Sequence, residues 1–300
     1  SRRQRQMCIR DRPKSNNGVL WIATGEANSG YILCQHVNYS GNEEPLGSID
    51  HDPYQETARF VSRDHSSEAS IPVPEPSPVL RERIDQQYQT ILARGNVEDP
   101  MGNLTVFNYP SKGALIRPPY TSYAHFLHVL DLCNSERQVS IYLPQDPVLR
   151  SAALSVCLSR IQRQNVDLMY VEEDESWNEH SLVGKIDIVH MGWWRDRWAI
   201  TSFANSSKGI CYLAGQNNEP KEWLRKASVR QTEFYQQRFQ TLFESFINEP
   251  RRKLRPGGLL PMLDIFRAWH NLCYQDKSGM TAAQSLGLTQ SPLTLRELLS

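Results

Sequence analysis

Residues 137 to 163, RQVSIYLPQDPVLRSAALSVCLSRIQR, constrain the fold more than any other stretch of the chain. Apolar residues alternate with others from 139 to 143, which is the period of a half-buried strand, and Pro144 ends this run. From 149 to 161 apolar residues recur at helical spacing, which predicts an amphipathic helix. The strand VDLMYV at 166 to 171 then completes a β-α-β crossover that should be parallel and right-handed. This pattern favours an α/β fold.

Asp146 lies directly after the first of these strands. In open α/β sheets, ligands and catalytic groups gather at the carboxyl ends of the strands, so Asp146 is a candidate site residue. The competing interpretation is that Asp146 caps the following helix, a role for which aspartate is well suited. The sequence leaves both interpretations open.

The composition bounds the class of protein and its partners. The 300 residues carry 33 basic and 33 acidic side chains, so a nucleic-acid partner would have to be held by a local basic patch. The hydrophobic content of 39% is ordinary for a globular chain, and no run of residues is long enough to predict a membrane span. The six cysteines are scattered without Cys-x-x-Cys pairs, which predicts neither a zinc site nor a disulfide framework and fits the reducing cytoplasm.

The chain is predicted to contain a core and a tail. The first twelve residues, SRRQRQMCIRDR, resemble the translated read-through of a sequencing adapter, so residues 1–17 are expected to lie outside the fold, and the natural protein is expected to begin further upstream. The core is predicted at 18–248, with a proline-rich insertion at 41–100 and a β-rich insertion at 174–220. Residues 249–300 are expected to form a helical tail.

Periodicity and turn residues predict the remaining elements. The predicted strands are a hairpin at 18–39 around the turn ANSG, a strand at 103–110, and KIDIVHMG, RWAITSFAN and GICYLAG. The predicted helices are 80–94, 120–133, 222–247, 262–271 and 281–287. The last of these and the following SPLTLRELL could form a helix-turn-helix, although the second piece carries a single basic residue, Arg296.

Two glutamates join Asp146 as candidate site residues. Glu26 closes the first strand of the hairpin and is either a metal ligand or an exposed turn residue. Glu233 lies among basic residues on the helix at 222–247 and is either a site residue or the partner of Arg230 in an ion pair.

Two further polar groups are interpreted as structural or exposed. The acidic run EEDESWNEHSLVG after Val171 is expected to be solvated rather than catalytic. His125 and His128 stand one turn apart on the helix at 120–133 and could suit a metal. With no third ligand in view, they are interpreted as structural or surface residues.

A local basic patch is concealed by the overall charge balance. Between Trp223 and Pro256 the chain has eight Lys or Arg against three Glu, and such a patch can neutralise DNA phosphates and make binding salt-dependent. The segment WWRDRW at 193–198 either stacks its rings on nucleic-acid bases or tucks them into the core as a hairpin tip. The predicted DNA-binding residues are Arg195, Arg197, Arg225, Lys226, Arg230, Arg238, Arg251, Arg252 and Lys253.

From about Val19 to its end, the chain resembles bacterial insertion-sequence transposases of the DDE type. The resemblance rests on an ordered series of segments: SGYILCQHVNY, PPYTSYAHF, IYLPQDPVLRSAAL, VDLMYV, WWRDRWAITSFAN, LRKASVRQTEFY and LLPMLDIFRAWHNLCYQDKSGMTAAQSLGL. Each segment is weakly specific alone, and the specificity comes from their order. The segment TAAQSLGL also resembles the ends of many integrases and transposases, with Ala282 in place of proline.

The resemblance implies an RNase H-like mixed sheet with helices on both faces and metal-dependent cleavage and transfer of DNA strands. It implies that Glu26, Asp146 and Glu233 are catalytic and hold two Mg²⁺ or Mn²⁺ ions. In such a site, paired ions activate the attacking oxygen and stabilise the leaving oxygen of an in-line displacement, and carboxylates are suitable ligands. The implied partner is double-stranded DNA, at the element ends and the target, bound by a homo-oligomer without a membrane.

Two positions depart from the family pattern. Pro144 stands where the first of two aspartates around Gln145 is expected, and Glu26 stands where aspartate is expected. The upstream portion should have carried a DNA-binding module. The alternative function is therefore a catalytically inactive DNA-binding or assembly protein that retains the transposase fold. A weaker alternative is a sensor domain related to phospholipase D folds, suggested by SFANSSKG but without the catalytic His-x-Lys pair.

Overall fold

The computed structural model of the chain describes residues 20–40, 79–93, 114–116, 118–133, 137–174, 176–177, 183–203, 206–215, 219–243 and 256–299. The chain divides into two compact units. The hairpin unit comprises residues 1–48, 104–132 and 230–300, and the sheet unit comprises residues 49–103 and 133–229. The predicted strand at 103–110 and the proline-rich segment before Val79 lie outside the described residues.

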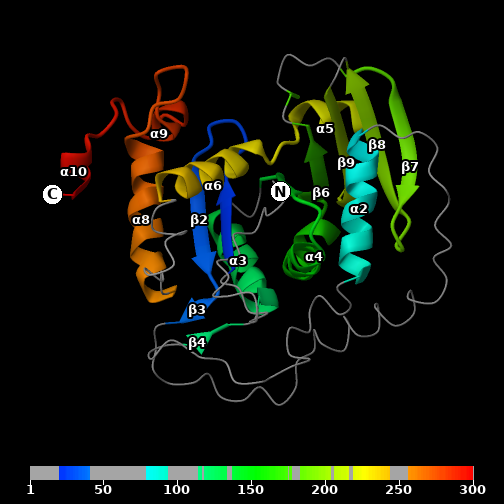
Figure 1. Cartoon of the computed structure of the whole chain (residues 1–300), viewed down its shortest axis with the longest axis horizontal. Coiled ribbons are helices and arrows are strands. Elements are labelled where there is room, and N and C mark those ends of the chain that lie inside the picture. Colours follow the sequence, from blue (N-terminus) through cyan, green and yellow to red (C-terminus); the bar gives the residue numbers. More distant parts are fainter. Residues whose placement is uncertain are drawn as a thin grey trace. The chain divides into compact units, whose positions relative to one another are not determined.

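The sheet unit contains a five-stranded mixed sheet with the strand order β5-β6-β9-β8-β7 (Figure 1). Strands β5 (Val139–Leu143) and β6 (Val166–Glu173) pair in parallel, and α4 (Pro147–Gln162) connects them, which confirms the predicted parallel β-α-β unit. Strands β9 (Ser206–Ala214), β8 (Asp196–Phe203) and β7 (Ile186–Met191) continue the sheet in antiparallel pairs. The chain is thus a mixed α/β protein.

Helices cover both faces of this sheet around β6, the strand between β5 and β9. All eight residues of β6 are buried, as expected for a strand with apolar layers on both sides. On one face, α5 (Pro220–Lys226) packs Trp223 and Leu224 against Met169 and Val171. On the other, α2 (Val79–Ala93) lies over β6 and β9. A Cβ on Gly209 of β9 would touch the Leu80 and Ile84 side chains, so glycine permits this close approach.

The hairpin unit is built on the antiparallel hairpin of β1 (Trp21–Gly25) and β2 (Ile32–Val37), which confirms the predicted hairpin. Helix α3 (Pro118–Leu132) packs on the hairpin, as do α6 (Arg230–Leu242) and α8 (Pro256–Leu272) (Figure 1). Strands β3 (Tyr39–Ser40) and β4 (Ala114–Leu115) form a second small sheet, and α9 (Ala282–Ser285) and α10 (Leu295–Leu299) follow α8. The core of this unit is aromatic, and its largest members are Trp21, Tyr235, Phe239 and Phe266.

The structure corrects three expectations about these elements. The helix predicted at 222–247 is interrupted, because Ala227 at the end of α5 is extended (φ −72°, ψ 126°) and α6 begins only at Arg230. On α3, helical spacing predicts that Leu127 points inward with Phe126, but Leu127 is 44% exposed, whereas His125 is fully buried. Glu172 and Glu173 of the acidic run are buried rather than solvated, because they belong to β6. Among the described residues, none of the helices combines the length and the apolar character that crossing a bilayer requires.

Candidate functional site

Glu26 lies in the tight turn between β1 and β2. Its Oε2 accepts hydrogen bonds from the backbone N–H groups of Asn28 (3.1 Å) and Ser29 (2.6 Å) and from the Ser29 hydroxyl (2.7 Å). Its Oε1 accepts one from the Asn28 amide (3.0 Å). Burial opposes ionisation of this carboxyl, yet the four donors outweigh it and lower its pKa. Glu26 therefore holds a negative charge that organises the turn.

Asp146 follows β5 and is the N-cap residue of α4. Its Oδ1 accepts a hydrogen bond from the Leu149 backbone N–H (3.0 Å), and Pro147 occupies the first turn, where a missing N–H is harmless. The capping interpretation of Asp146 is confirmed. Capping does not exclude a second role, because a carboxylate has a further oxygen and further lone pairs.

Glu233 lies in the first turn of α6, half-buried. This turn packs against the turn of Glu26: a Cβ on Gly25 would approach Thr232 Cγ2 to 3.3 Å, and one on Gly30 would approach Gln231 Oε1 to 2.8 Å. Gly30 has φ +71°, a conformation that favours glycine. The fold thus brings the segments of Glu26 and Glu233 together across more than 200 residues of sequence, whereas Asp146 belongs to the sheet unit.

The predicted DNA-binding residues differ in their exposure. Arg195, Arg197, Arg225 and Lys226 are exposed, and Lys226 pairs with Glu222. Arg230 is half-buried at the start of α6. Arg251, Arg252 and Lys253 lie outside the described residues.

Arg238 is turned toward its own unit. Its guanidinium lies 3.6 Å from the centre of the Tyr274 ring, and Nη1 is 2.8 Å from Nδ1 of His270. Because an arginine only donates, His270 Nδ1 accepts, and Nε2–H donates to the Gly30 carbonyl at 3.0 Å. Arg238 thereby helps to hold α6, α8 and the hairpin turn together.

The WWRDRW segment forms the tip of the β7–β8 hairpin. Some of its side chains pack inward and others are exposed. Asp196 is buried and accepts hydrogen bonds from Tyr88 Oη (2.6 Å) and Arg150 Nη1 (2.9 Å). Trp198 is fully buried and donates its Nε1–H to Tyr88, while the Arg150 guanidinium lies 4.4 Å over the Trp194 ring. The interpretation as a hairpin tip is confirmed for Trp198.

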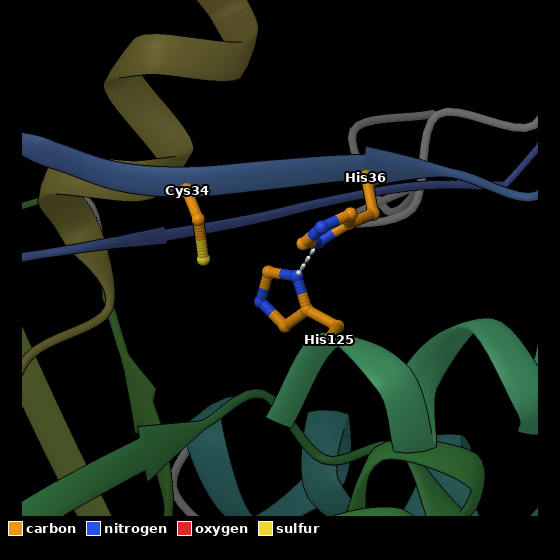
Figure 2. A group of neighbouring side chains, drawn as sticks. All are labelled: Cys34, His36 and His125. Atoms are coloured by element: carbon orange, nitrogen blue, oxygen red, sulfur yellow. Dashed lines mark hydrogen bonds between the residues drawn. The ribbon is translucent and has the colours of Figure 1, made fainter. Parts of the chain in front are cut away.

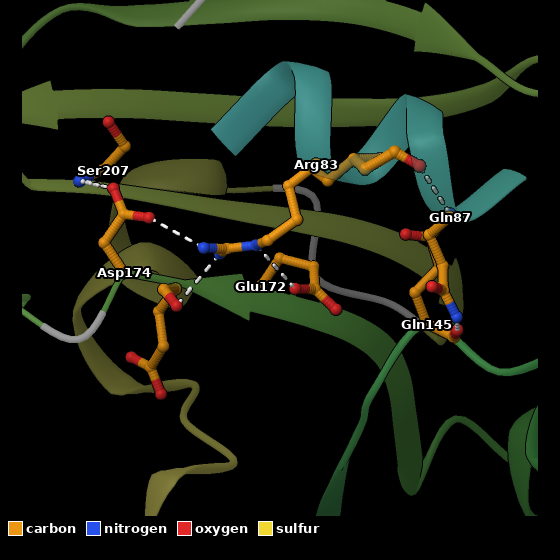
Figure 3. Close-up of polar contacts among 8 residues, drawn as sticks. Arg83, Gln87, Gln145, Glu172, Asp174 and Ser207 are labelled. Carbon is orange, nitrogen blue, oxygen red and sulfur yellow. Dashed lines mark hydrogen bonds and ion pairs between the residues drawn. The ribbon is translucent and has the colours of Figure 1, made fainter. Parts of the chain in front are cut away.

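Charged side chains gather at the carboxyl end of β6, on both faces of the sheet. Figure 3 shows Arg83 of α2 reaching Asp174 (Nη1–Oδ1, 2.9 Å) and Glu172 (Nε–Oε2, 3.6 Å). Glu173 pairs with Lys208 of β9 at 3.5 Å, and these two side chains are 3% and 2% exposed. Buried ion pairs of this kind fix an arrangement more than they add stability. Glu172, Glu173 and Asp174 thus have a structural role in the sheet unit.

A cluster of nitrogen and sulfur ligands lies between β2 and α3. The ligand atoms of Cys34, His36 and His125 lie within 4.8 Å of one another, and Figure 2 shows the three side chains turned toward a common point. Nδ1 of His36 is 2.8 Å from Nδ1 of His125, and Nε2 of His125 is 2.7 Å from Thr24 Oγ1. Cys34 is 1% exposed and His125 is fully buried.

Electrostatics keep these imidazoles neutral. Burial, together with the neighbouring His36 and His128, lowers the pKa of His125 to about 3. Burial likewise lowers the pKa of His36, with His128 and Arg267 adding to the shift. Neutral imidazole is the form that binds metal ions.

The sequence interpretation missed this cluster, although one signal was present. Cys34 and His36 are two residues apart on a strand, so their side chains share a face. Their meeting with His125 depends on the packing of α3 and has no local signature.

Comparisons with known proteins do not assign the chain to a family. No family model matches the sequence, and neither a curated protein nor a solved structure is significantly similar to it.

Proposed function

We propose that this protein is a DNA transposase of the DDE type with an RNase H-like catalytic core, which cleaves and transfers DNA strands with divalent metal ions. The proposal rests first on the ordered series of family-like segments from about Val19 onward. The structural observation that supports it best is the packing of the Glu26 turn against the first turn of α6, which carries Glu233. Two of the three predicted acids thereby belong to one packed end of the hairpin.

Asp146 is the proposed third acid, and its position at the end of a strand supports this role. Asp146 follows β5, the strand that leads into the parallel β-α-β unit, and carboxyl ends of strands are the usual places for chemistry. Its Oδ1 caps α4, and the same carboxylate is the proposed metal ligand.

The donor set suits magnesium or manganese. Glu26, Asp146 and Glu233 offer carboxylate oxygens, the ligands that hard divalent cations prefer. Glu26 Oε2 already accepts three hydrogen bonds, whereas Oε1 accepts one and retains a lone pair. A bound pair of metal ions would activate the attacking oxygen and stabilise the leaving oxygen. The turn donors lower the pKa of Glu26 and orient its carboxylate, which suits it to this proposed role.

DNA binding is proposed for the exposed basic residues. Arg225, Lys226, Arg195 and Arg197 present their charges to solvent and can contact phosphates without desolvating a buried charge. Double-stranded DNA at element ends and target sites is the proposed substrate of a homo-oligomer in the cytoplasm. The affinity should fall steeply with salt, since each neutralised phosphate releases counterions.

The test is a cleavage assay with the full chain on element-end duplex DNA in Mg²⁺ or Mn²⁺. We expect nicking that EDTA abolishes and that Glu26→Gln, Asp146→Asn and Glu233→Gln each reduce to background. Asp187→Asn is the matched control, because Asp187 is an exposed carboxylate on β7 and should leave the rate unchanged. If the three acid variants cleave DNA as fast as the Asp187→Asn control, these acids are not catalytic.

An inactive copy of the same fold is the second candidate, and one observation favours it. Glu26 is committed to four turn hydrogen bonds, and Pro144 replaces an expected acid next to Asp146. This candidate predicts salt-dependent DNA binding that neither EDTA nor Asp146→Asn alters. Cleavage that is absent in this chain but restored by Pro144→Asp would identify it as the correct one.

A further inference from the structure

We propose that Cys34, His36 and His125 bind one zinc-class transition-metal ion between β2 and α3. This site is separate from the proposed carboxylate site. It differs in chemistry, because imidazole and thiolate ligands select zinc-like ions and not magnesium. It does not depend on the proposed function.

The geometry of the three side chains suits a small tetrahedral ion. Zinc–nitrogen and zinc–sulfur bonds of about 2.0 to 2.3 Å place neighbouring ligand atoms roughly 3.5 Å apart. The ligand atoms here lie within 4.8 Å of one another, so side-chain rotations suffice to close the site. Cys34 and His36 project from the same face of β2, toward His125 on α3 (Figure 2). Three protein ligands leave the fourth position for water.

Thr24 supplies the support that a metal-binding histidine usually has. The Nε2–H of His125 can donate to Thr24 Oγ1 at 2.7 Å, which fixes the tautomer and leaves the Nδ1 lone pair directed at His36. Without a metal, that lone pair accepts the Nδ1–H of His36 at 2.8 Å. With a metal, His36 carries its proton on Nε2 instead, and both Nδ1 atoms become ligands.

The competing interpretation is a hydrogen-bonded histidine pair that merely packs in the core. Such a pair explains the contact between His36 and His125, but it gives no reason for a buried thiol within reach of both rings. The metal site uses all three groups at once. The proton balance is definite: the thiol of Cys34 loses its proton to form the metal–sulfur bond, and one proton leaves the protein per ion bound.

The experiment uses the full chain, stripped with EDTA and titrated with Co²⁺ or Zn²⁺. We expect one ion per chain, release of about one proton, and a thiolate-to-cobalt charge-transfer band. Cys34→Ser should abolish this band, and His36→Asn and His125→Asn should each weaken binding by at least tenfold. The matched controls are Cys133→Ser and His190→Asn, which lie outside the cluster and should bind as the unaltered chain does.

Two measurements keep the proposal testable if a ligand variant does not fold. X-ray absorption of the unaltered zinc-loaded chain should show one sulfur at about 2.3 Å and nitrogen ligands at about 2.0 to 2.1 Å. Thr24→Val keeps the shape of residue 24 but removes the acceptor, and should weaken metal binding roughly 10- to 100-fold. The proposal is overturned by a zinc shell without sulfur, by a cobalt band that survives Cys34→Ser, by copper binding alone, or by no stoichiometric uptake.

Discussion

Acidification should destabilise the hairpin unit through His270. This side chain is 6% exposed and is held as a neutral ring, with Nδ1 accepting from Arg238 and Nε2–H donating to the Gly30 carbonyl. Burial lowers its pKa from 6.5 to about 4; the Gly30 carbonyl opposes this shift and the Arg238 charge adds to it. The unfolded chain therefore takes up a proton at a higher pH than the folded chain does.

The sign and size of this effect of pH on stability follow from the linkage between protonation and folding. The pKa of His270 is lower in the folded chain than in the unfolded chain. The free energy of unfolding is therefore unaffected above about pH 7 and falls as the pH drops from 6.5 toward about 4. With these two pKa values, the free energy of unfolding should fall by about 2 kcal/mol between pH 7 and pH 5, at about 1.4 kcal/mol per pH unit. His36 and His125 also have lowered pKa values and add to the slope in the same direction.

The assay compares the original chain with His270→Gln, a neutral donor and acceptor that cannot be protonated. Urea unfolding should be followed by hydrogen exchange in peptides of β1 and α8, in EDTA, at pH 7, 6 and 5. The variant should be less stable at pH 7 but should lose about 2 kcal/mol less on acidification. Identical pH slopes in the two proteins would refute the reasoning.

Three further predictions concern the sheet unit, measured by hydrogen exchange of β8 and β9 peptides in urea. Asp196→Ala should lower the free energy of unfolding by about 2 to 4 kcal/mol, because it leaves the Arg150 charge and the Tyr88 hydroxyl without their buried acceptor. Gly192→Ala should lower it by about 2 to 4 kcal/mol, since Gly192 has φ +72° and a Cβ there would stand 2.5 Å from the Tyr88 ring. Asp146→Ala should lower it by about 1 kcal/mol through loss of the α4 cap, whereas Asp146→Asn should retain most of the capping while removing the proposed metal ligand.

One control serves all three of these predictions. Asp187→Ala changes an exposed residue of β7 that pairs with a largely exposed Lys185 at 3.3 Å, and should alter stability by less than about 0.5 kcal/mol. An effect of Asp196→Ala no larger than this control would mean that the Asp196 network contributes nothing measurable.

Local sequence pattern predicted the structure correctly where a segment's own residues decide it. The alternation in 139–143, the helical spacing after Pro147 and the turn at Asn28 to Gly30 correctly predicted β5, α4 and the β1–β2 hairpin. The same logic offered capping as one of two interpretations of Asp146, and the donor that the cap needs is only three residues away.

Local pattern failed where an element's surroundings decide its structure. Residues 222–247 read as one helix because both pieces have helical spacing, but Ala227 and Val229 are buried in the sheet unit's core and the backbone there is extended. The acidic run after Val171 read as exposed because charge usually means solvent. Instead, Glu172 and Glu173 extend β6, and the cations of Arg83 and Lys208 compensate their burial.

The sequence by itself determined the α/β class and the β-α-β unit, because periodicity and residue type are properties of the chain. Only the tertiary structure decided which side chains meet. Cys34 and His36 are separated from His125 by about ninety residues, and α3 brings them together by packing on the hairpin. Such a meeting depends on the free energy of burying α3, which no single segment encodes.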